Sequence, residues 1–307
     1  MKIPRALSPL KEFVKQGRHS LRNWYVRRFL AFTPADFLQA LRSLGIRPGD
    51  LICVHSSFDR FLGFTGNVGD ALKILQEAVG EEGGLMMPTQ PFGGSAIDYV
   101  RAHPVTNIAR TLSQVGMITE LLRRTKGAVR SIHPTHPVAL WGKRGTPLAD
   151  RDYEATTPCG KGTAYARLLD QSGKILLLGT GAQPITFYHF VEELIEPLMP
   201  FSPFTDEVFE LTSIDAAGRS YATRTRLLDP GWSARRKMYL MVPELKKQGF
   251  WREARIGRLE LILLDAADIV KACVAMARRG EFCYEGAPGT VANGLARPSR
   301  TQTSASG

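Results

Sequence analysis

Hydrophobic positions along the chain follow two different periods. Windows in which apolar residues recur every three or four positions, as at Val68, Leu72 and Leu75, indicate helices that bury one face. Short continuous apolar runs between these windows indicate buried strands, of which 174–178 is the clearest. The predicted helices are 34–44, 68–79, 112–124, 163–170, 185–196, 233–248 and 266–279. The predicted strands are 51–55, 85–87, 138–141, 174–178 and 259–264.

A period of two replaces these patterns near residue 208. Segments 208–214 and 220–227, separated by turn residues at 215–218, predict an antiparallel hairpin. Helices that alternate with buried strands before this hairpin predict an α/β fold, a three-layer mixed sheet flanked by helices with a C-terminal β-hairpin region. Thr33 as N-cap and Pro34 at the first helical position are expected to start the first helix.

The positive charge of the chain is concentrated at its ends. The 307 residues carry a formal net charge of +11, of which 1–32 contribute +7 and 286–307 contribute +2. Because the remainder is nearly neutral, we predict no nucleic-acid partner. The chain divides into a basic N-terminal leader (1–32), one folded domain (33–286) and a disordered tail (287–307) poor in large apolar residues. The leader is interpreted either as a basic amphipathic helix on a membrane surface or as an extra helix packed on the domain.

Cysteine usage and hydropathy indicate the compartment. No run of about 18 apolar residues is present, and the N-terminus lacks the apolar stretch of a secretory signal. The cysteines form no CxxC pair and predict neither a disulfide framework nor a zinc knuckle. We therefore expect a cytoplasmic protein. The four cysteines are Cys53, Cys159, Cys273 and Cys283.

Three polar segments are candidates for chemistry, and the first leaves the strand at 51–55. Open α/β sheets bind ligands at the C-terminal ends of their strands. His55, Ser56 and Ser57 at this exit could present hydroxyls and backbone N–H groups to an anion. The alternative is a strand-ending turn with a capping serine.

The second segment, 130–137, holds two histidines beside prolines. Proline keeps His133 and His136 in an extended segment rather than on a helix. A metal would need a third ligand that the neighbouring sequence does not supply, so no metal is predicted. Ser131 adds a hydroxyl, and the alternative interpretation is a rigid turn.

The third segment is the helix at 185–196, which follows the clearest strand. Helical spacing places Thr186 and His189 along one stripe with Glu192 or Glu193 and with Glu196. A carboxylate beside a histidine fixes its tautomer and raises its basicity, as a general base requires. The alternative is a solvated polar face with a chance pair. Three motifs of common enzymes, namely a Walker loop, GxSxG and HExxH, do not occur in the sequence.

Together these segments resemble the aminoglycoside 3-N-acetyltransferase family, acetyl-CoA-dependent antibiotic N-acetyltransferases whose fold differs from that of the GNAT enzymes. The likeness runs from about residue 34 to 228. It is carried by LGIRPGDLICVHSSF (44–58), EEGGLMMPTQPF (81–92), SQVGMITELLRRTKGAVRSIHPTHPVALWG (113–142), TPCGKG (157–162) and GKILLLGTGAQPITFYHFVEE (173–193).

The resemblance implies an acyltransferase whose acetyl-CoA co-substrate and small-molecule amine bind together for direct transfer. His189 would be the general base, and Glu192 would orient it. Thr186, Glu193 and Asp98 would contact the amine substrate. The residues implied to face CoA are His55, Ser56, Ser57, Ser131, His133 and His136.

Two departures from the family pattern affect the substrate and CoA contacts. Pro137 stands where the family commonly has serine, and Gly162-Thr163-Ala164 stands where Gly-Ser-Pro is frequent, so that Thr163-Ala164 replace Ser-Pro. No acidic run marks a cleft for a polycationic drug, so an amino sugar or another small amine rivals an aminoglycoside as acceptor. A hydrolytic or non-catalytic relative is the alternative function. A homodimer and a weak membrane-surface contact through the leader are further hypotheses.

Overall fold

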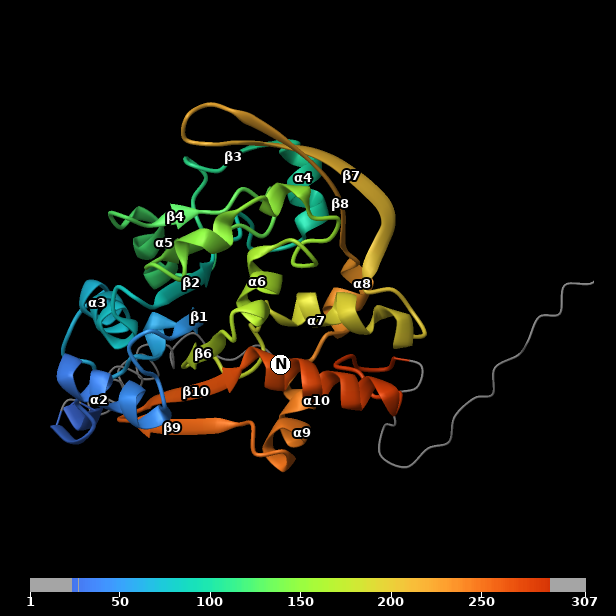
Figure 1. The fold of residues 1–307 in the computed structure, drawn as a ribbon. Helices are drawn as coiled ribbons and strands as arrows, with labels where there is room; N and C mark the ends of the chain where they lie inside the picture. The colour runs from blue at the N-terminus through green and yellow to red at the C-terminus, as the bar shows by residue number, and fades with distance from the viewer. Residues whose placement is uncertain (1–23, 27, 288–307) are drawn as a thin grey trace, which may run out of the picture.

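A seven-stranded mixed sheet organises the part of the chain that the computed structural model describes, residues 24–26 and 28–287 (Figure 1). Most of the predicted leader and all but one residue of the predicted tail lie outside these residues, so those assignments stay predictions. The sheet order is β4 (Val129–Arg130), β5 (Val138–Trp141), β2 (Gly84–Pro88), β1 (Leu51–Ser56), β6 (Lys174–Leu178), β10 (Leu259–Asp265) and β9 (Arg252–Ile256).

The centre of this sheet is parallel and its two sides are antiparallel. Strand β1 pairs in parallel with β2 and with β6, whereas β5 and β10 run antiparallel to the neighbours they meet. The C-terminal ends of β2, β1 and β6 therefore meet at one edge of the sheet. Polar residues His55, Gln90 and Thr180 lie at or just beyond these ends. This is the edge at which open α/β sheets bind ligands.

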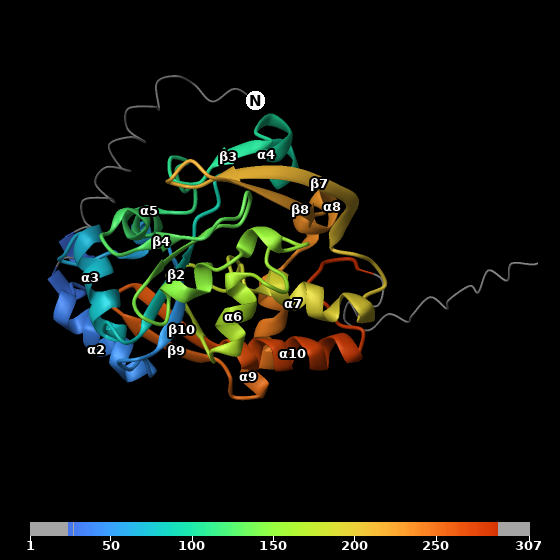
Figure 2. The same cartoon turned by 45° about the horizontal axis from the view of Figure 1, so that its top comes forward.

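Two helical layers cover the sheet, which confirms the predicted three-layer arrangement (Figure 2). Side chains alternate along β1, so that Ile52 and Val54 face one helical layer while Leu51 and Cys53 face the other. The first layer contains α2 (Pro34–Leu44), α3 (Val68–Val79) and α5 (Met117–Arg124). The second contains α6 (Ala164–Asp170), α7 (Tyr188–Ile195), α9 (Val242–Lys247) and α10 (Ala266–Arg278).

Local sequence explains where the first helices begin. The Thr33 side chain accepts the backbone N–H of Asp36, and the Asp36 carboxylate accepts the backbone N–H of Thr33. Asn67 and Asp70 form the same reciprocal pair at the start of α3. Each reciprocal pair satisfies backbone N–H groups that the first helical turn leaves unpaired. The predicted role of Thr33 as N-cap is confirmed.

The predicted hairpin forms a second, smaller sheet that arches over the top of the molecule in Figure 1. Strands β7 (Phe204–Ile214) and β8 (Ser220–Leu228) pair antiparallel, and β3 (Val105–Asn107) adds in parallel to β7. Helix α4 (Ala96–Ala102) packs Ile97 and Val100 on this sheet. Strand β8 then leads the chain back toward the C-terminal edge of the parallel strands.

The largest departure from the predicted elements lies at 233–248, where one helix was expected. The segment instead divides between α8 (Pro230–Arg235), a 3₁₀ turn at Met238–Met241 and α9. Arg236 between them is extended, with φ −67° and ψ 123°, and forms an isolated antiparallel bridge with Tyr284. The single-helix prediction is therefore wrong, because the backbone at Arg236 pairs with a distant segment. The short elements α4, β3, β4 and β9 were also missed.

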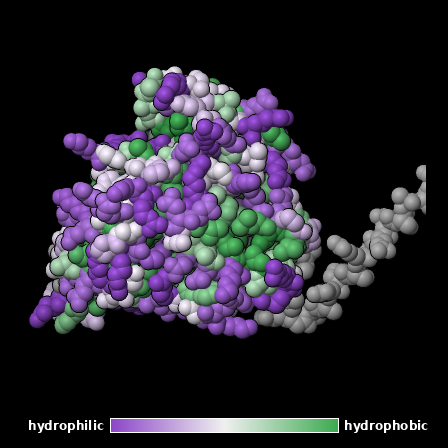
Figure 3. All heavy atoms as spheres, in the orientation of Figure 1, coloured by the Kyte–Doolittle hydropathy of each residue, from purple (hydrophilic) through white to green (hydrophobic). Residues whose placement is uncertain are grey.

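One area of the surface in Figure 3 is visibly more hydrophobic than its surroundings and lies over α7. Leu194 and Leu198 are among the exposed large apolar side chains of this region. Within residues 24–26 and 28–287, no helix is long and apolar enough to cross a lipid bilayer.

Candidate active site

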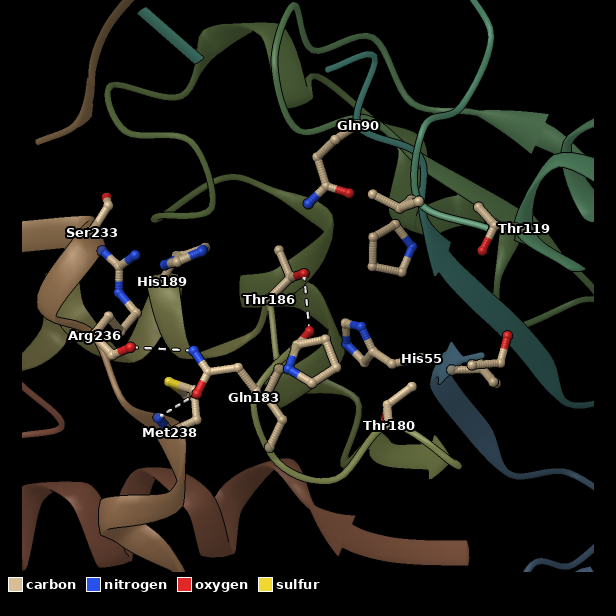
Figure 4. Close-up of a pocket in the computed structure, with 16 residues that line it drawn as sticks. His55, Gln90, Thr119, Thr180, Gln183, Thr186, His189, Ser233, Arg236 and Met238 are labelled. Carbon is tan, nitrogen blue, oxygen red and sulfur yellow. Dashed lines mark hydrogen bonds between the residues drawn. The ribbon is translucent and has the colours of Figure 1, made fainter. Parts of the chain in front are cut away.

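Two adjoining cavities open at the C-terminal edge of the parallel strands. The first, of about 240 Å³, is bounded by His55 and Ser56 from β1, by Gln90 after β2 and by Thr180 after β6 (Figure 4). The second, of about 560 Å³, is bounded by the loop that follows β2 and by residues beyond β8. Residues that line both cavities are Gln90, Val115, His189, Ser233 and Arg236.

His189 lies at the boundary between the two cavities. It is the second residue of α7, and its imidazole Nδ1 lies 2.7 Å from Oε2 of Glu192. The histidine side chain is 14% exposed, whereas the Glu192 side chain is fully buried. The alternative of a solvated polar face is therefore wrong for this pair. The i,i+3 spacing brings the two side chains together as the sequence predicted.

Two further donors complete the surroundings of Glu192. The Arg236 guanidinium donates from Nε to Oε1 at 2.6 Å, and the Tyr284 hydroxyl donates to the same oxygen. Burial alone would raise the pKa of Glu192, but Arg236, His189 and these hydrogen bonds together hold it below its ordinary value. Glu192 is thus a buried carboxylate whose charge is balanced by a cation.

The same environment keeps His189 neutral near pH 7. Burial lowers the pKa of the imidazole and the Arg236 cation lowers it further, while Glu192 opposes both effects without reversing them. With its Nδ1–H directed at the ionised Glu192, the neutral ring has Nε2 as its remaining proton acceptor. A neutral imidazole held by a carboxylate can accept a proton from a bound nucleophile.

Gln183 fixes the segment that carries Arg236. Its side chain donates to the carbonyl oxygen of Arg236 and accepts the backbone N–H of Met238, both at 3.2 Å (Figure 4). No local sequence pattern points to Arg236 or Tyr284, because they are 44 and 92 residues from Glu192. Arg236 was also placed within a helix that does not form.

The sequence model of the family described as Aminoglycoside 3-N-acetyltransferase matches residues 53–278. The chain belongs to this family. Its resemblance to the family's sequence segments is thereby confirmed, and with it the acyltransferase class.

Individual relatives agree with this membership. Aminoglycoside N(3)-acetyltransferase VII of Streptomyces paromomycinus is 26% identical over 257 residues, which cover 76% of this chain and 88% of the relative. The crystal structure of aminoglycoside acetyltransferase AAC(3)-Xa has 25% identity and a TM-score of 0.70, with 82% of this chain and 95% of that chain covered. AAC-IIIb, solved as a binary complex with CoASH, shares the fold at 22% identity and a TM-score of 0.66, covering 80% and 97%.

Of the three residues predicted to face CoA at the end of β1, two line the cavities. His55 and Ser56 line the first cavity. Burial, with a smaller effect of His189, lowers the pKa of His55 to about 3, so this ring is neutral. Ser57 lines neither cavity, and its backbone N–H donates to the carbonyl oxygen of Leu178 at 3.0 Å.

The segment 131–136 divides between a rigid turn and a cavity wall. Ser131 Oγ accepts the backbone N–H of Val138, and His133 Nδ1 accepts the backbone N–H groups of Thr135 and His136 at 3.2 and 3.0 Å. Ser131 and His133 are fully buried and line neither cavity, which agrees with the alternative interpretation of this segment as a rigid turn. His136 lines the second cavity, and its ring centroid is 5.9 Å from that of His189.

The three residues predicted to contact the amine also differ in position. Thr186 lines the first cavity. Glu193 points to the loop at 157–161, where it accepts the Lys161 N–H at 2.9 Å and the Thr157 hydroxyl. Any side chain at Gly160 would overlap this carboxylate, which explains a glycine there. Asp98 is exposed on α4 and, like Glu193, lines neither cavity. The geometry therefore does not support the predicted substrate contacts of Glu193 and Asp98.

The polar side chains around the cavities differ from a metal-binding set. Among the described residues, no group of three or more histidine, cysteine, aspartate or glutamate side chains is arranged to hold a metal ion. Apart from Arg236, the cavities offer neutral hydrogen-bonding groups. The buried Oε1 of Gln90, which lines both cavities, has no hydrogen-bond partner. An unpaired buried acceptor of this kind fits a ligand that donates a hydrogen bond.

Proposed function

We propose that this protein transfers the acetyl group of acetyl-CoA directly to an amine of an aminoglycoside or amino-sugar-like acceptor. The observation that carries the proposal is His189, a neutral imidazole hydrogen-bonded to the buried Glu192 at the boundary of two adjoining cavities. The two adjoining cavities together would hold the thioester and the acceptor. Family membership, a CoASH complex of AAC-IIIb and a sisomicin complex of AAC-VIa support this proposal.

The proposed reaction has His189 as general base. The acceptor enters as a neutral amine and its nitrogen attacks the thioester carbonyl carbon, so that an N–C bond forms. As the C–S bond breaks, the amine proton passes to Nε2 of His189, and the imidazolium then gives a proton to the departing thiolate, which becomes CoASH. Glu192 stabilises the imidazolium in between. A positioned base contributes about 10²–10⁴-fold in rate.

Residues at the strand exits would position the reactants. His55 and Ser56 are our candidates for contacts with CoA in the first cavity, and His136 is the candidate in the second. Ser57, Ser131 and His133 would act only by shaping the loops that carry these contacts. Holding two reactants in attack geometry can contribute as much as proton transfer does.

The test uses the full chain with acetyl-CoA and a panel of amines, followed by detection of free thiol and of the acetylated product. We expect thiol release that depends on the amine and matches product mole for mole. Thiol release at the same rate without an amine would instead indicate a hydrolase. A cytoplasmic location, a homodimer and the single domain at 33–286 stay predictions.

A further inference from the structure

The walls of both cavities lack acidic side chains. Among the described residues that line them, none is an aspartate or a glutamate. Arg236 is the charged residue of the lining, since His55, His136 and His189 are held neutral by burial. The lining therefore carries no negative charge that could pair with an ammonium group.

Three carboxylates next to lining residues have partners within the protein. Glu192 lies beneath His189 and is bonded to three donors within the protein. Asp229 lies in the sequence between Leu228 and Pro230, which line the second cavity. It caps α8 by accepting the backbone N–H of Trp232 at 2.9 Å. Glu120, near the loop at 114–115, forms salt bridges with Arg123 and Arg124.

Asp98 is a further acidic residue close to the second cavity, because Ser95 and Ala96 line it. Its side chain is exposed on the first turn of α4. Water and salt screen an exposed charge at the cavity rim strongly. One such carboxylate does not provide the several buried partners that a polycation would require.

Neutral donors and acceptors occupy the lining in place of charges. Gln90 is the clearest, because its buried Oε1 is unpaired and it lines both cavities. Amide and hydroxyl groups of this kind match the hydroxyls of a sugar. The other neutral polar side chains of the lining are Ser56, Ser95, Gln114, Thr119, Thr180, Gln183, Thr186 and Ser233.

We infer that the acceptor is a hydroxyl-rich amine with a single basic nitrogen, a mono-amino sugar, rather than an aminoglycoside with several ammonium groups. This inference rests on the proposed function and narrows its substrate class. The single amine would enter deprotonated and react at His189. Each additional ammonium group would be desolvated near Arg236 with no carboxylate to pair with it, which is unfavourable.

The first experiment compares kcat/KM for glucosamine, which has one amine, with kcat/KM for sisomicin, which has several. With the full chain and saturating acetyl-CoA, we expect glucosamine to be favoured by about tenfold or more, because an ammonium group without a carboxylate partner weakens binding. A higher kcat/KM for sisomicin would overturn the inference while leaving the proposed function intact. Absence of acetylation with every amine tested would overturn the function itself.

The second experiment changes the charge of the cavity at one position. Val115 lines both cavities and is 39% exposed, so a polar side chain is tolerated there. Val115→Asp should raise the sisomicin-to-glucosamine ratio of kcat/KM by about tenfold, and added NaCl should reduce that gain. The asparagine of Val115→Asn has nearly the shape of aspartate without its charge. This variant should leave the sisomicin-to-glucosamine ratio of kcat/KM near that of the parent protein. Equal ratios for the two variants would show that cavity charge does not select the acceptor, and the inference would fail.

Discussion

The segments 131–136 and 186–193 both bury histidines, but they give the rings different partners. Nδ1 of His133 accepts two backbone N–H groups, whereas Nδ1 of His189 lies against the Glu192 carboxylate. Burial lowers the pKa of both rings. Of the two, His189 also lines the cavities. Burial and a lowered pKa therefore do not identify a general base, which also needs a free ring nitrogen that a ligand can reach.

Replacement of His189 is expected to have the largest effect on activity. His189→Ala removes the proposed proton acceptor and should reduce kcat by at least about 10²-fold. Binding of CoA, measured by calorimetry, should be retained, because the strand exits that bound the first cavity are unchanged. Normal turnover by this variant would show that the base is a different group.

Glu192→Gln tests whether the carboxylate supports the histidine or performs the chemistry. The imidazole remains, so the loss of kcat should be smaller than for His189→Ala. The buried Arg236 cation would lose its counter-ion, which should lower the free energy of unfolding by about 3–5 kcal/mol. Denaturant unfolding and steady-state kinetics measure the two effects.

Glu196→Gln is the matched control for this variant, since Glu196 pairs with Arg226 at a partly exposed site. Its unfolding free energy should change by about 1 kcal/mol or less. Similar stability losses in the two variants would contradict a special role for the buried carboxylate.

His133 should affect stability more than catalysis. His133→Ala leaves two backbone N–H groups without their acceptor, and we expect a loss of about 1–3 kcal/mol in the free energy of unfolding. Asparagine can accept the same backbone groups, so His133→Asn should recover part of that loss. A fall in kcat/KM as large as that of His189→Ala, measured well below the unfolding transition, would place His133 in the chemistry.

The smallest expected effect is a displacement of the pH profile. Protonated His189 cannot accept a proton, so kcat at saturating neutral amine should fall on the acidic side. The lowered pKa of His189 places this limb below the ordinary histidine value of 6.5. Glu192 raises the pKa of His189, so Glu192→Gln should move the limb to still lower pH. A displacement toward higher pH in the variant would contradict the ion pairing described here.

Local patterns in the sequence identified the elements that depend on local interactions. Helices α2 and α3 have capping pairs within four residues, and the apolar runs of β1 and β6 bury side chains on both faces of the sheet. The His189–Glu192 pair was predictable for the same reason, because both residues lie within one turn of a helix.

Long-range pairing limits what the sequence can predict. Strand β9 is a half-buried edge strand of five residues, whose exposure alternates without a continuous apolar run. Arg236 breaks an apparently helical segment because its backbone pairs with Tyr284 and its guanidinium with Glu192. Neither partner is visible in the sequence around Arg236, so two of the three donors to the Glu192 carboxylate could not be inferred from the sequence.

The hydrogen bonds from Arg236 and Tyr284 also constrain the order in which the active site is assembled during synthesis. A growing polypeptide presents Glu192 well before position 236 emerges, and position 284 comes only after the last helix. Until then the acid has no cation beside it and would remain hydrated. Since domains tend to fold as units, a nascent chain should gain a competent catalytic base only on closing its C-terminal layer. Premature termination before that point would yield a fragment without enzymatic activity.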